Sequence, residues 1–399
     1  MTRRIFGTGG ILAILLSLSG CGGSSSSPST PAPSCPGGTP PGLSDTASPL
    51  PVYESTCAGT VNIPVVTLHI CVPGTSTCQD VPNILVDFGS TGLRLSHTLP
   101  IAGELPQEQI GGQPLYECYY FESGYNYGPV VTATVTLDGQ SVQVPVQISN
   151  SSLSAPCGNI VSPTSPSAPF QPYYNGILGV LFPQYDDLDS SAIYLEGSQS
   201  SVVNPSQSET VQNPVYLLPI SSNDGVLLTI STKVSSSQGA PSFTGTLTFG
   251  ALSSGTGTQL QTDRYGEITA TYPSSGTGST HYSAFFDTGS NGFFFDNSLI
   301  PQCTGNDSGF FCGNASSQTV TFSSPTSSSS NKFTLHFSIV SAQTLFATGN
   351  TVFSTLGGFQ SDLFDAGFPA FLYGHNIGLS WTSTCSPSSN PGQGCFVIQ

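Results

Sequence analysis

Short apolar or Thr-rich runs alternate with clusters of turn-forming residues along most of the chain. Residues 65–72, 130–137, 142–148, 245–249 and 319–322 are such runs. β-Branched and aromatic residues bounded by Gly, Pro, Asn and Ser are typical of short strands. No window has apolar residues at the spacing of a long amphipathic helix. The pattern therefore predicts an all-β protein.

The first 21 residues have the pattern of an export signal. Arg3 and Arg4 begin it, residues 11–16 form a short apolar run, and Leu-Ser-Gly-Cys ends at Cys21. The run is too short to span a bilayer as a permanent helix. Residues 18–21 resemble the bacterial lipobox, in which the chain is cut before the cysteine and the thiol is acylated. An ordinary secretory signal followed by a free cysteine is the alternative.

This resemblance implies an exported protein that is lipid-anchored through Cys21. Gly22 follows the cysteine, and by resemblance to lipoproteins of double-membrane bacteria a residue other than Asp there favours the outer membrane. We therefore expect a signal peptide at 1–20. Residues 21–51 comprise the anchor and a stretch rich in Ser, Pro and Gly without apolar periodicity, which is typical of a flexible tether.

Charged residues are scarce, and most of them are acidic. Charged residues are 7% of the 399 residues, with 22 acids against 6 bases. Nucleic acid is excluded as a partner, because phosphate neutralisation needs Lys and Arg. We expect a monomer that contacts a membrane only through its lipid anchor.

The chain has 11 cysteines, of which ten remain when Cys21 is set aside. An even number in an exported protein favours structural disulfides. Three pairs bracket turn-rich segments and are close in sequence: Cys71 with Cys78, Cys303 with Cys312, and Cys385 with Cys395. The connectivity of four others stays open: Cys35, Cys57, Cys118 and Cys157. A metal site is the rival interpretation, but the chain has no Cys-x-x-Cys and its five His are far apart, so we expect no metal and no cofactor.

An internal repeat is the most informative feature. Residues 84–95 read ILVDFGSTGLRL and residues 284–295 read AFFDTGSNGFFF. Each copy has an apolar run, Asp-x-Gly-Ser-x-Gly and a further apolar residue. A single such Asp is ordinary turn chemistry, but two in one frame indicate a duplication whose lobes face each other. We therefore predict that Asp87 and Asp287 meet between two lobes, at about 52–235 and 236–399.

Two adjacent carboxylates hold one proton between them, because both cannot ionise cheaply. The charged member can deprotonate a water while the other protonates the carbonyl oxygen under attack, which is general acid–base hydrolysis of an amide. The glycines of the two turns, Gly89 and Gly289, allow close backbone approach. The serines after them, Ser90 and Ser290, can donate hydrogen bonds to the outer carboxylate oxygens.

These motifs resemble those of the pepsin-like aspartic proteases. Residues 284–292 match the apolar-Asp-Thr-Gly-Ser motif of that superfamily, and residues 174–183 resemble its apolar-Gly motif beside the first aspartate. Residues 245–255 look like the strand that opens its C-terminal lobe. The resemblance covers about residues 52–399 and implies an all-β, bilobal fold of two β-barrel-like lobes with an active-site cleft between them. The chain also resembles the uncharacterised bacterial lipoprotein families that have a pepsin-like core.

The first motif departs from the family pattern. Phe88 stands where the family has a threonine, and the two family threonines hydrogen-bond across the lobes. Thr288 keeps its hydroxyl, whereas Phe88 has none. A second apolar-Gly motif, at residues 371–374, matches only approximately.

The family also closes a hairpin tyrosine over its cleft. The count from Asp87 places this hairpin at residues 118–131, with Phe121 at the tyrosine position and Gly124 in the turn; a slip of one residue uses Tyr120. The alternative is that these aromatic side chains simply cover a sheet face.

Three functions follow from these observations. The first is a cell-surface aspartic endopeptidase that acts on peptide or protein substrates. The second is a catalytically impaired pepsin-fold lipoprotein that binds peptides, because Phe88 alters the first loop. The third is a structural surface lipoprotein.

Overall fold

The structure, a computed structural model, describes residues 49–399 with interruptions. It leaves out residues 56, 58, 122–123, 151, 154–155, 158–173, 189–190, 198–200, 220, 251, 253–256, 275–277, 326–330, 383–384 and 386–392. The predicted signal peptide, Cys21 and Cys35 lie outside the described residues, as does nearly all of the predicted tether.

Strands dominate the described residues, which confirms the all-β prediction. The strands up to residue 230 are β1 (Leu50–Glu54), β2 (Pro64–Cys71), β3 (Cys78–Asp87), β4 (Thr91–Ser96), β5 (Gln109–Ile110), β6 (Gln113–Phe121), β7 (Gly124–Leu137), β8 (Gln140–Ser149), β9 (Gly176–Val180), β10 (Ala192–Glu196), β11 (Ser201–Val203) and β12 (Gly225–Ile230). The later strands are β13 (Thr244–Phe249), β14 (Thr258–Gln261), β15 (Ile268–Ser274), β16 (Gly278–Asp287), β17 (Phe293–Phe295), β18 (Ala315–Ser323), β19 (Lys332–Ile339), β20 (Gly357–Phe359), β21 (Leu363–Gly367), β22 (Ile377–Ser380) and β23 (Cys395–Ile398).

Helical segments in the described part of the chain are short. They are the 3-10 turns η1 (Pro100–Gly103), η2 (Asp186–Leu188), η3 (Pro214–Leu217), η4 (Gly305–Asp307) and η5 (Phe368–Tyr373), and the α-helix α2 (Ala342–Phe346). Among these helices, none has the length and apolar character that a membrane span requires.

The N-terminal half forms a closed barrel. Its strands follow the order β2, β3, β9, β4, β8 and β7, and pairing of β7 with β2 closes the ring. Valine, leucine and isoleucine fill these strands, and Val66, Leu68, Val86, Val135 and Val144 are all fully buried. In β4 and β9 every residue is buried, and burial on both faces of a strand is the physical basis of an apolar run in the sequence.

The C-terminal half contains an open half-barrel whose strands follow the order β19, β18, β15, β16, β21, β17 and β20. Its core is built from phenylalanine rings. Phe286 packs against Phe322, Phe371 and Phe396, with ring centroids 4.8 to 6.5 Å apart. Such pairs add about 0.5–1.5 kcal/mol each to the burial of their area.

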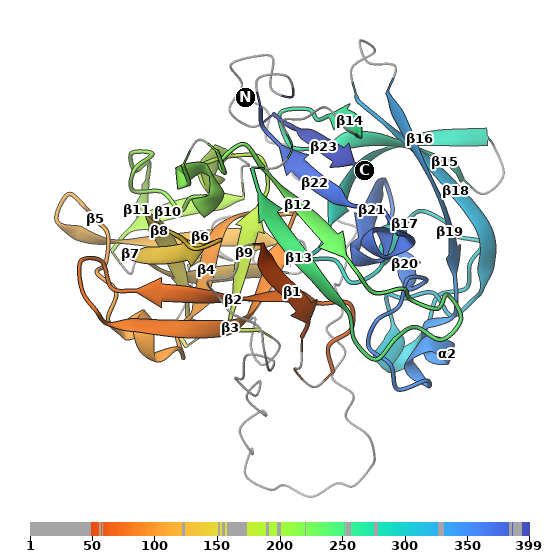
Figure 1. Cartoon of the computed structure of the whole chain (residues 1–399), viewed down its shortest axis with the longest axis horizontal. Helices are drawn as coiled ribbons and strands as arrows, with labels where there is room; N and C mark the ends of the chain where they lie inside the picture. The colour runs from red at the N-terminus through yellow and green to blue at the C-terminus, as the bar shows by residue number, and fades with distance from the viewer. Residues whose placement is uncertain are drawn as a thin grey trace, which may run out of the picture.

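Backbone hydrogen bonds join the two halves. β1 pairs with β2 of the barrel on one side and with β13 on the other. β13 continues the sheet through β12, β22, β23 and β14. Figure 1 shows β1, β12 and β13 in the middle of the molecule, between the barrel and the strands β15 to β19. The molecule is therefore bilobal, with a continuous sheet between the lobes.

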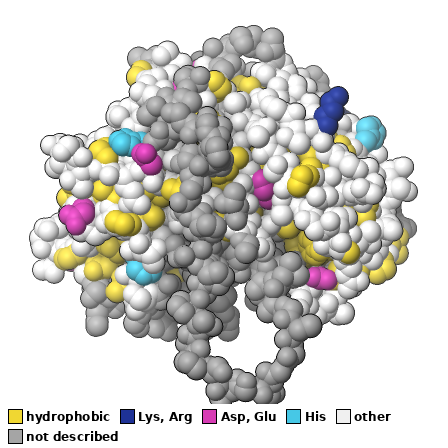
Figure 2. All heavy atoms as spheres, turned by 60° about the horizontal axis from the view of Figure 1, so that its bottom comes forward, with side chains coloured by type: hydrophobic (Ala, Val, Ile, Leu, Met, Phe, Trp, Pro, Cys, Tyr) yellow, Lys and Arg dark blue, Asp and Glu magenta, His cyan; other side chains and the backbone are white. Residues whose placement is uncertain are grey.

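The disulfides of the described residues include the three predicted pairs, Cys71–Cys78, Cys303–Cys312 and Cys385–Cys395, which are confirmed. Cys118 bonds to Cys157, a connectivity that the sequence left open. Cys57 is also disulfide-bonded. Figure 2 shows a face on which charged side chains are few and widely separated, as the composition requires. Covalent links and burial, rather than surface ion pairs, therefore hold this fold.

Candidate active site

The two repeat copies occupy the same position in the two lobes. Asp87 ends β3 and pairs in parallel with Gly179 of β9, and Asp287 ends β16 and pairs in parallel with Gly367 of β21. Both partners must be glycine. A Cβ at Gly179 would lie 2.7 Å from the Ser90 carbonyl oxygen, and one at Gly367 would lie 2.1 Å from a backbone oxygen of the neighbouring turn. The backbone therefore crosses each aspartate turn at close range.

The second apolar-Gly motif was predicted at residues 371–374, and this prediction is wrong. The strand that passes beside Asp287 ends in Asp365, Ala366 and Gly367. Phe371 lies instead in η5, and Gly374 follows that turn with a φ of 82°. Gly374 has open space around it, whereas Gly367 is packed against backbone, so only Gly367 meets the steric requirement.

The structure brings Asp87 and Asp287 together where the lobes meet. A Cβ built on Gly89 would lie 2.6 Å from Oδ1 of Asp287, and one built on Gly289 would lie 2.7 Å from Oδ1 of Asp87. Each carboxylate thus contacts the glycine of the opposite turn. Burial and the nearby charge of Asp87 both raise the pKa of Asp287, so a state with one protonated carboxyl group is favoured.

Each carboxylate is also held by its own turn, and the two sets of contacts are alike. The glycine two residues later donates its N–H to Oδ1, and the serine three residues later donates its hydroxyl to Oδ2. For the first copy these donors are Gly89 (2.8 Å) and Ser90, and for the second they are Gly289 (2.8 Å) and Ser290 (2.8 Å). The donors leave little rotational freedom, so the carboxylates are fixed before any ligand arrives.

A threonine links the two turns from one side only. Thr288 donates its hydroxyl to the Val86 carbonyl oxygen at 2.6 Å and accepts the Phe88 N–H at 3.0 Å. Phe88 returns no side-chain hydrogen bond. Its ring is fully buried and packs edge-on against Phe371, with centroids 5.5 Å apart. The hydrogen bonds from the Thr288 side of the link are therefore present. On the Phe88 side, an aromatic contact replaces the hydrogen bonds of a second threonine.

The protonation of Asp287 is strongly perturbed. Its pKa lies well above the ordinary value, first because of burial, then because of the charges of Asp87 and Asp365. Asp87 is 5% exposed, and Asp287 keeps partial contact with solvent. Asp365 did not emerge from the sequence, because its position depends on the pairing of β21 with β16. Burial and the two neighbouring carboxylates therefore favour the protonated form of Asp287.

The hairpin of β6 and β7 carries the predicted flap residues. Phe121 lies opposite Gly124, whose φ of 148° suits glycine, and Tyr120 lies opposite Tyr125. Phe121 packs in a cluster that includes Leu85, two residues before Asp87. Tyr120 faces the other way and donates its hydroxyl to the Cys157 carbonyl oxygen at 2.7 Å. Of these two aromatic residues, Phe121 is thus on the side of the aspartates.

Tyr119, which the sequence did not single out, lies closer to the first turn. Its hydroxyl accepts the N–H of Thr91, directly after Ser90, at 3.4 Å. Its ring lies under the guanidinium of Arg94, 3.4 Å from the carbon of that group to the ring centroid. The strand alternation that places Phe121 inward also places Tyr119 inward.

Arg94 is fully buried and joins three segments. It donates to Glu117 of β6 at 2.9 Å, to Asp186 of η2 at 2.6 Å and to the Thr91 carbonyl oxygen at 2.6 Å. Burial alone would lower the pKa of Arg94, but the charges of Glu117 and Asp186 raise it above its ordinary value. The buried Arg94 guanidinium therefore binds both the first aspartate turn and the hairpin of β6 and β7.

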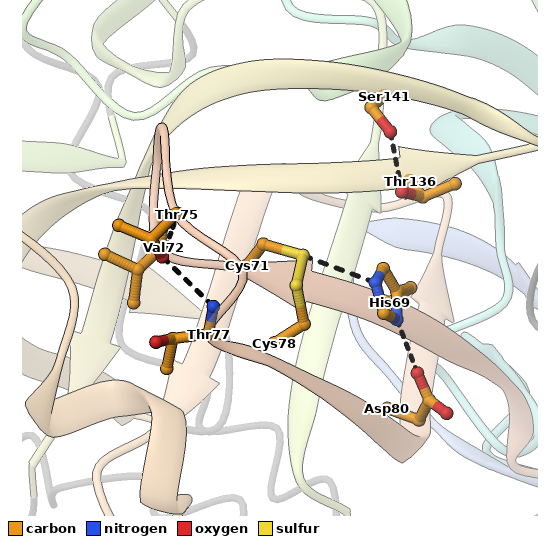
Figure 3. Close-up of a disulfide and its surroundings, with 9 residues drawn as sticks. All are labelled: His69, Cys71, Val72, Thr75, Thr77, Cys78, Asp80, Thr136 and Ser141. Atoms are coloured by element: carbon orange, nitrogen blue, oxygen red, sulfur yellow. Dashed lines mark hydrogen bonds and ion pairs between the residues drawn. A yellow bond between two sulfur atoms is a disulfide. The ribbon is translucent and has the colours of Figure 1, made fainter.

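One group in the described part of the chain has the composition of a metal site: His69, Cys71 and Cys78. Figure 3 shows that the two cysteines form a disulfide and that His69 lies between Cys71 and Asp80. His69 Nε2 is 3.3 Å from the Cys71 sulfur, and His69 Nδ1 is 2.6 Å from Oδ1 of Asp80. Metal ligation requires thiolates, so this group does not bind a metal in its oxidised form.

The fold and this paired-aspartate site define a protein with the bilobal pepsin-like architecture. A solved structure of an aspartic proteinase from Irpex lacteus matches with a TM-score of 0.51 and 15% identity, over 88% of this chain and 96% of that chain. The chain belongs to the DUF3443 family, described as a protein of unknown function, whose model matches residues 44–398. No curated protein sequence matches the chain.

Proposed function

We propose that this protein is an aspartic endopeptidase in which Asp87 and Asp287 activate a water molecule against a peptide carbonyl. The observation that carries the proposal is that each of the two carboxylates lies against the glycine of the opposite turn and is held by a glycine N–H and a serine hydroxyl of its own turn. The ionised carboxylate takes a proton from the water, and the protonated one donates to the carbonyl oxygen. No covalent intermediate is needed.

A specific feature favours a second candidate, a pepsin-fold protein that binds peptides without cleaving them. Phe88 replaces one hydroxyl of the link between the turns by a buried ring. A displacement of the carboxylates by a fraction of an ångström would reduce catalysis while leaving a binding surface.

The test is incubation of the purified protein with an unfolded protein substrate between pH 3 and 7. Cleavage that disappears in both Asp87→Asn and Asp287→Asn supports the endopeptidase, and Asp307→Asn, a change in η4 outside both aspartate turns, should leave cleavage intact. Absence of cleavage at every pH contradicts the endopeptidase. Binding of the same substrate without cleavage then supports the second candidate.

We further propose that the protein is exported and anchored in the outer membrane by acylation of Cys21, with the tether as spacer. The lipobox-like sequence at residues 18–21 supports this. Incorporation of labelled palmitate into the expressed full chain, and its loss in Cys21→Ser, is the expected result. Unlabelled wild-type protein would contradict it.

A further inference from the structure

A third carboxylate lies beside the aspartate pair. Asp365 precedes Gly367 by two residues on β21, and Gly367 is the residue opposite Asp287. Alternate residues of a strand project to the same face, so Asp365 shares the sheet face of Asp287 and sits diagonally across from it. Gly367 has no side chain to separate them. Asp365 is only 6% exposed, so solvent screens its charge poorly.

The N-terminal copy of the repeat has no acid at this position. β9 pairs with β3 as β21 pairs with β16, and Ile177 occupies the place of Asp365. The residues opposite also differ, since Ile177 faces Arg94 on β4 whereas Asp365 faces Phe294 on β17. In the C-terminal copy the acidic Asp365 therefore lies opposite a phenylalanine. In the N-terminal copy the apolar Ile177 lies opposite an arginine.

Among the described residues, the two that lie opposite Asp365 on the neighbouring strands, Phe285 and Phe294, carry no charge. The carboxylates of these strands are Asp287 at the end of β16 and Asp296 directly after β17. The charge of Asp365 adds to burial and to the charge of Asp87 in raising the pKa of Asp287.

We propose that Asp365 is a positioning residue of the aspartate pair, whose negative charge keeps the shared proton on Asp287 and preserves the singly protonated pair at less acidic pH. Its use in catalysis rests on the proposed endopeptidase function, because only the singly protonated pair can both deprotonate water and protonate the substrate carbonyl. The electrostatic role itself does not require that the protein cleave peptides.

The experiment measures the protonation of Asp287 directly. The infrared difference spectrum between the wild type and Asp287→Asn isolates the carboxyl band of Asp287, and its titration between pH 3 and 9 gives a midpoint. The same subtraction is made in an Asp365→Asn background. The expected result is a midpoint at lower pH when Asp365 is neutral, because a nearby like charge favours the protonated acid.

Asp296→Asn is the matched control, since it removes a carboxylate beside the same sheet, and it should leave the midpoint unchanged. An unchanged midpoint in Asp365→Asn overturns the proposal, as does an equal shift in both variants. If Asp365→Asn does not fold, Asp365→Ile, which copies Ile177 of the other lobe, makes the same test.

Activity gives a separate measurement. If the wild type cleaves peptides, the alkaline limb of its pH profile should move toward acid in Asp365→Asn, and an unmoved limb contradicts the role in catalysis. If the wild type cleaves nothing, the endopeptidase proposal fails, while the infrared titration still decides the role of Asp365.

Discussion

The Thr288 hydroxyl and the Val86 carbonyl oxygen lie 2.6 Å apart across the junction of the two lobes, and the same hydroxyl accepts the Phe88 N–H. Because Thr288 is fully buried, neither bond is replaced by water when the hydroxyl is removed. One side chain therefore sets the relative position of the two aspartate turns.

Replacement of Thr288 by valine tests this link. The change keeps the shape of the side chain but leaves a buried N–H and a buried carbonyl without their partner. We expect the free energy of unfolding to fall by about 1–3 kcal/mol, as measured by urea denaturation. Thr344→Val, on the exposed side of α2, should change it by less than about 0.5 kcal/mol. Equal effects of the two changes would contradict the link.

Phe88→Thr restores the threonine of the aspartic-protease motif. Since Phe88 is buried against Phe371, the smaller side chain leaves a cavity and places a hydroxyl in apolar surroundings. We expect a loss of about 2–4 kcal/mol and no gain in any peptidase activity. Melting temperature and cleavage rate are measured on the same preparation. A stable variant with higher activity would show that the ring impairs the site rather than supports it.

The buried Arg94 should be indispensable for stability. Arg94→Met removes the cation and leaves Glu117 and Asp186 as uncompensated buried carboxylates. The expected loss is about 3–5 kcal/mol. Arg264→Met is the control, because Arg264 is exposed and interacts with the neighbouring Tyr265, so its loss should be below about 0.5 kcal/mol. A mild effect of Arg94→Met would mean that the carboxylates take up protons at little cost.

The raised pKa of Asp287 has a consequence for the pH dependence of stability. A carboxyl group whose pKa is higher in the folded state binds protons more tightly there, so its contribution to stability is complete below the unfolded pKa and is lost as pH rises through the folded pKa. We therefore expect Asp287→Asn to unfold at a higher temperature than the wild type at pH 7, with a smaller difference at pH 3. A difference that grows toward acid would contradict this sign.

Glu54 provides an independent case. It lies on β1, is 6% exposed, and has a pKa raised well above its ordinary value by burial. By the same linkage, Glu54→Gln should raise the melting temperature at pH 7 more than at pH 3. Glu209→Gln changes an acid outside the buried interior as a control, and a similar response of both variants would contradict the argument.

The sequence predicted those features that depend on local pattern. Strand alternation, close cysteine pairs and the repeated Asp-x-Gly-Ser turn are each contained in a few consecutive residues. Asp87 and Asp287 could be paired because both stand in the same apolar frame. The second apolar-Gly motif was placed at residues 371–374, whereas the glycine that lies against a crossing backbone is Gly367, and an apolar-Gly pattern alone does not reveal this.

Features that depend on pairing between distant segments could not be predicted. Arg94 meets Glu117 and Asp186, which are 23 and 92 residues away. Asp365 reaches Asp287 only through the parallel pairing of β21 with β16. Tyr119 contacts the first turn and Tyr120 faces away from it, and this difference depends on how β6 is placed against the distant residues Thr91 and Cys157.

The place of β1 between β2 and β13 determines how the molecule carries mechanical load. Its hydrogen bonds to both neighbours are perpendicular to the strand, so tension applied at residue 49 along the strand axis shears two sets of bonds at once. The force therefore acts on the sheet that joins the lobes, and it is shared between the two lobes. A molecule held by a chain that precedes residue 49 would therefore resist extension without drawing Asp87 away from Asp287.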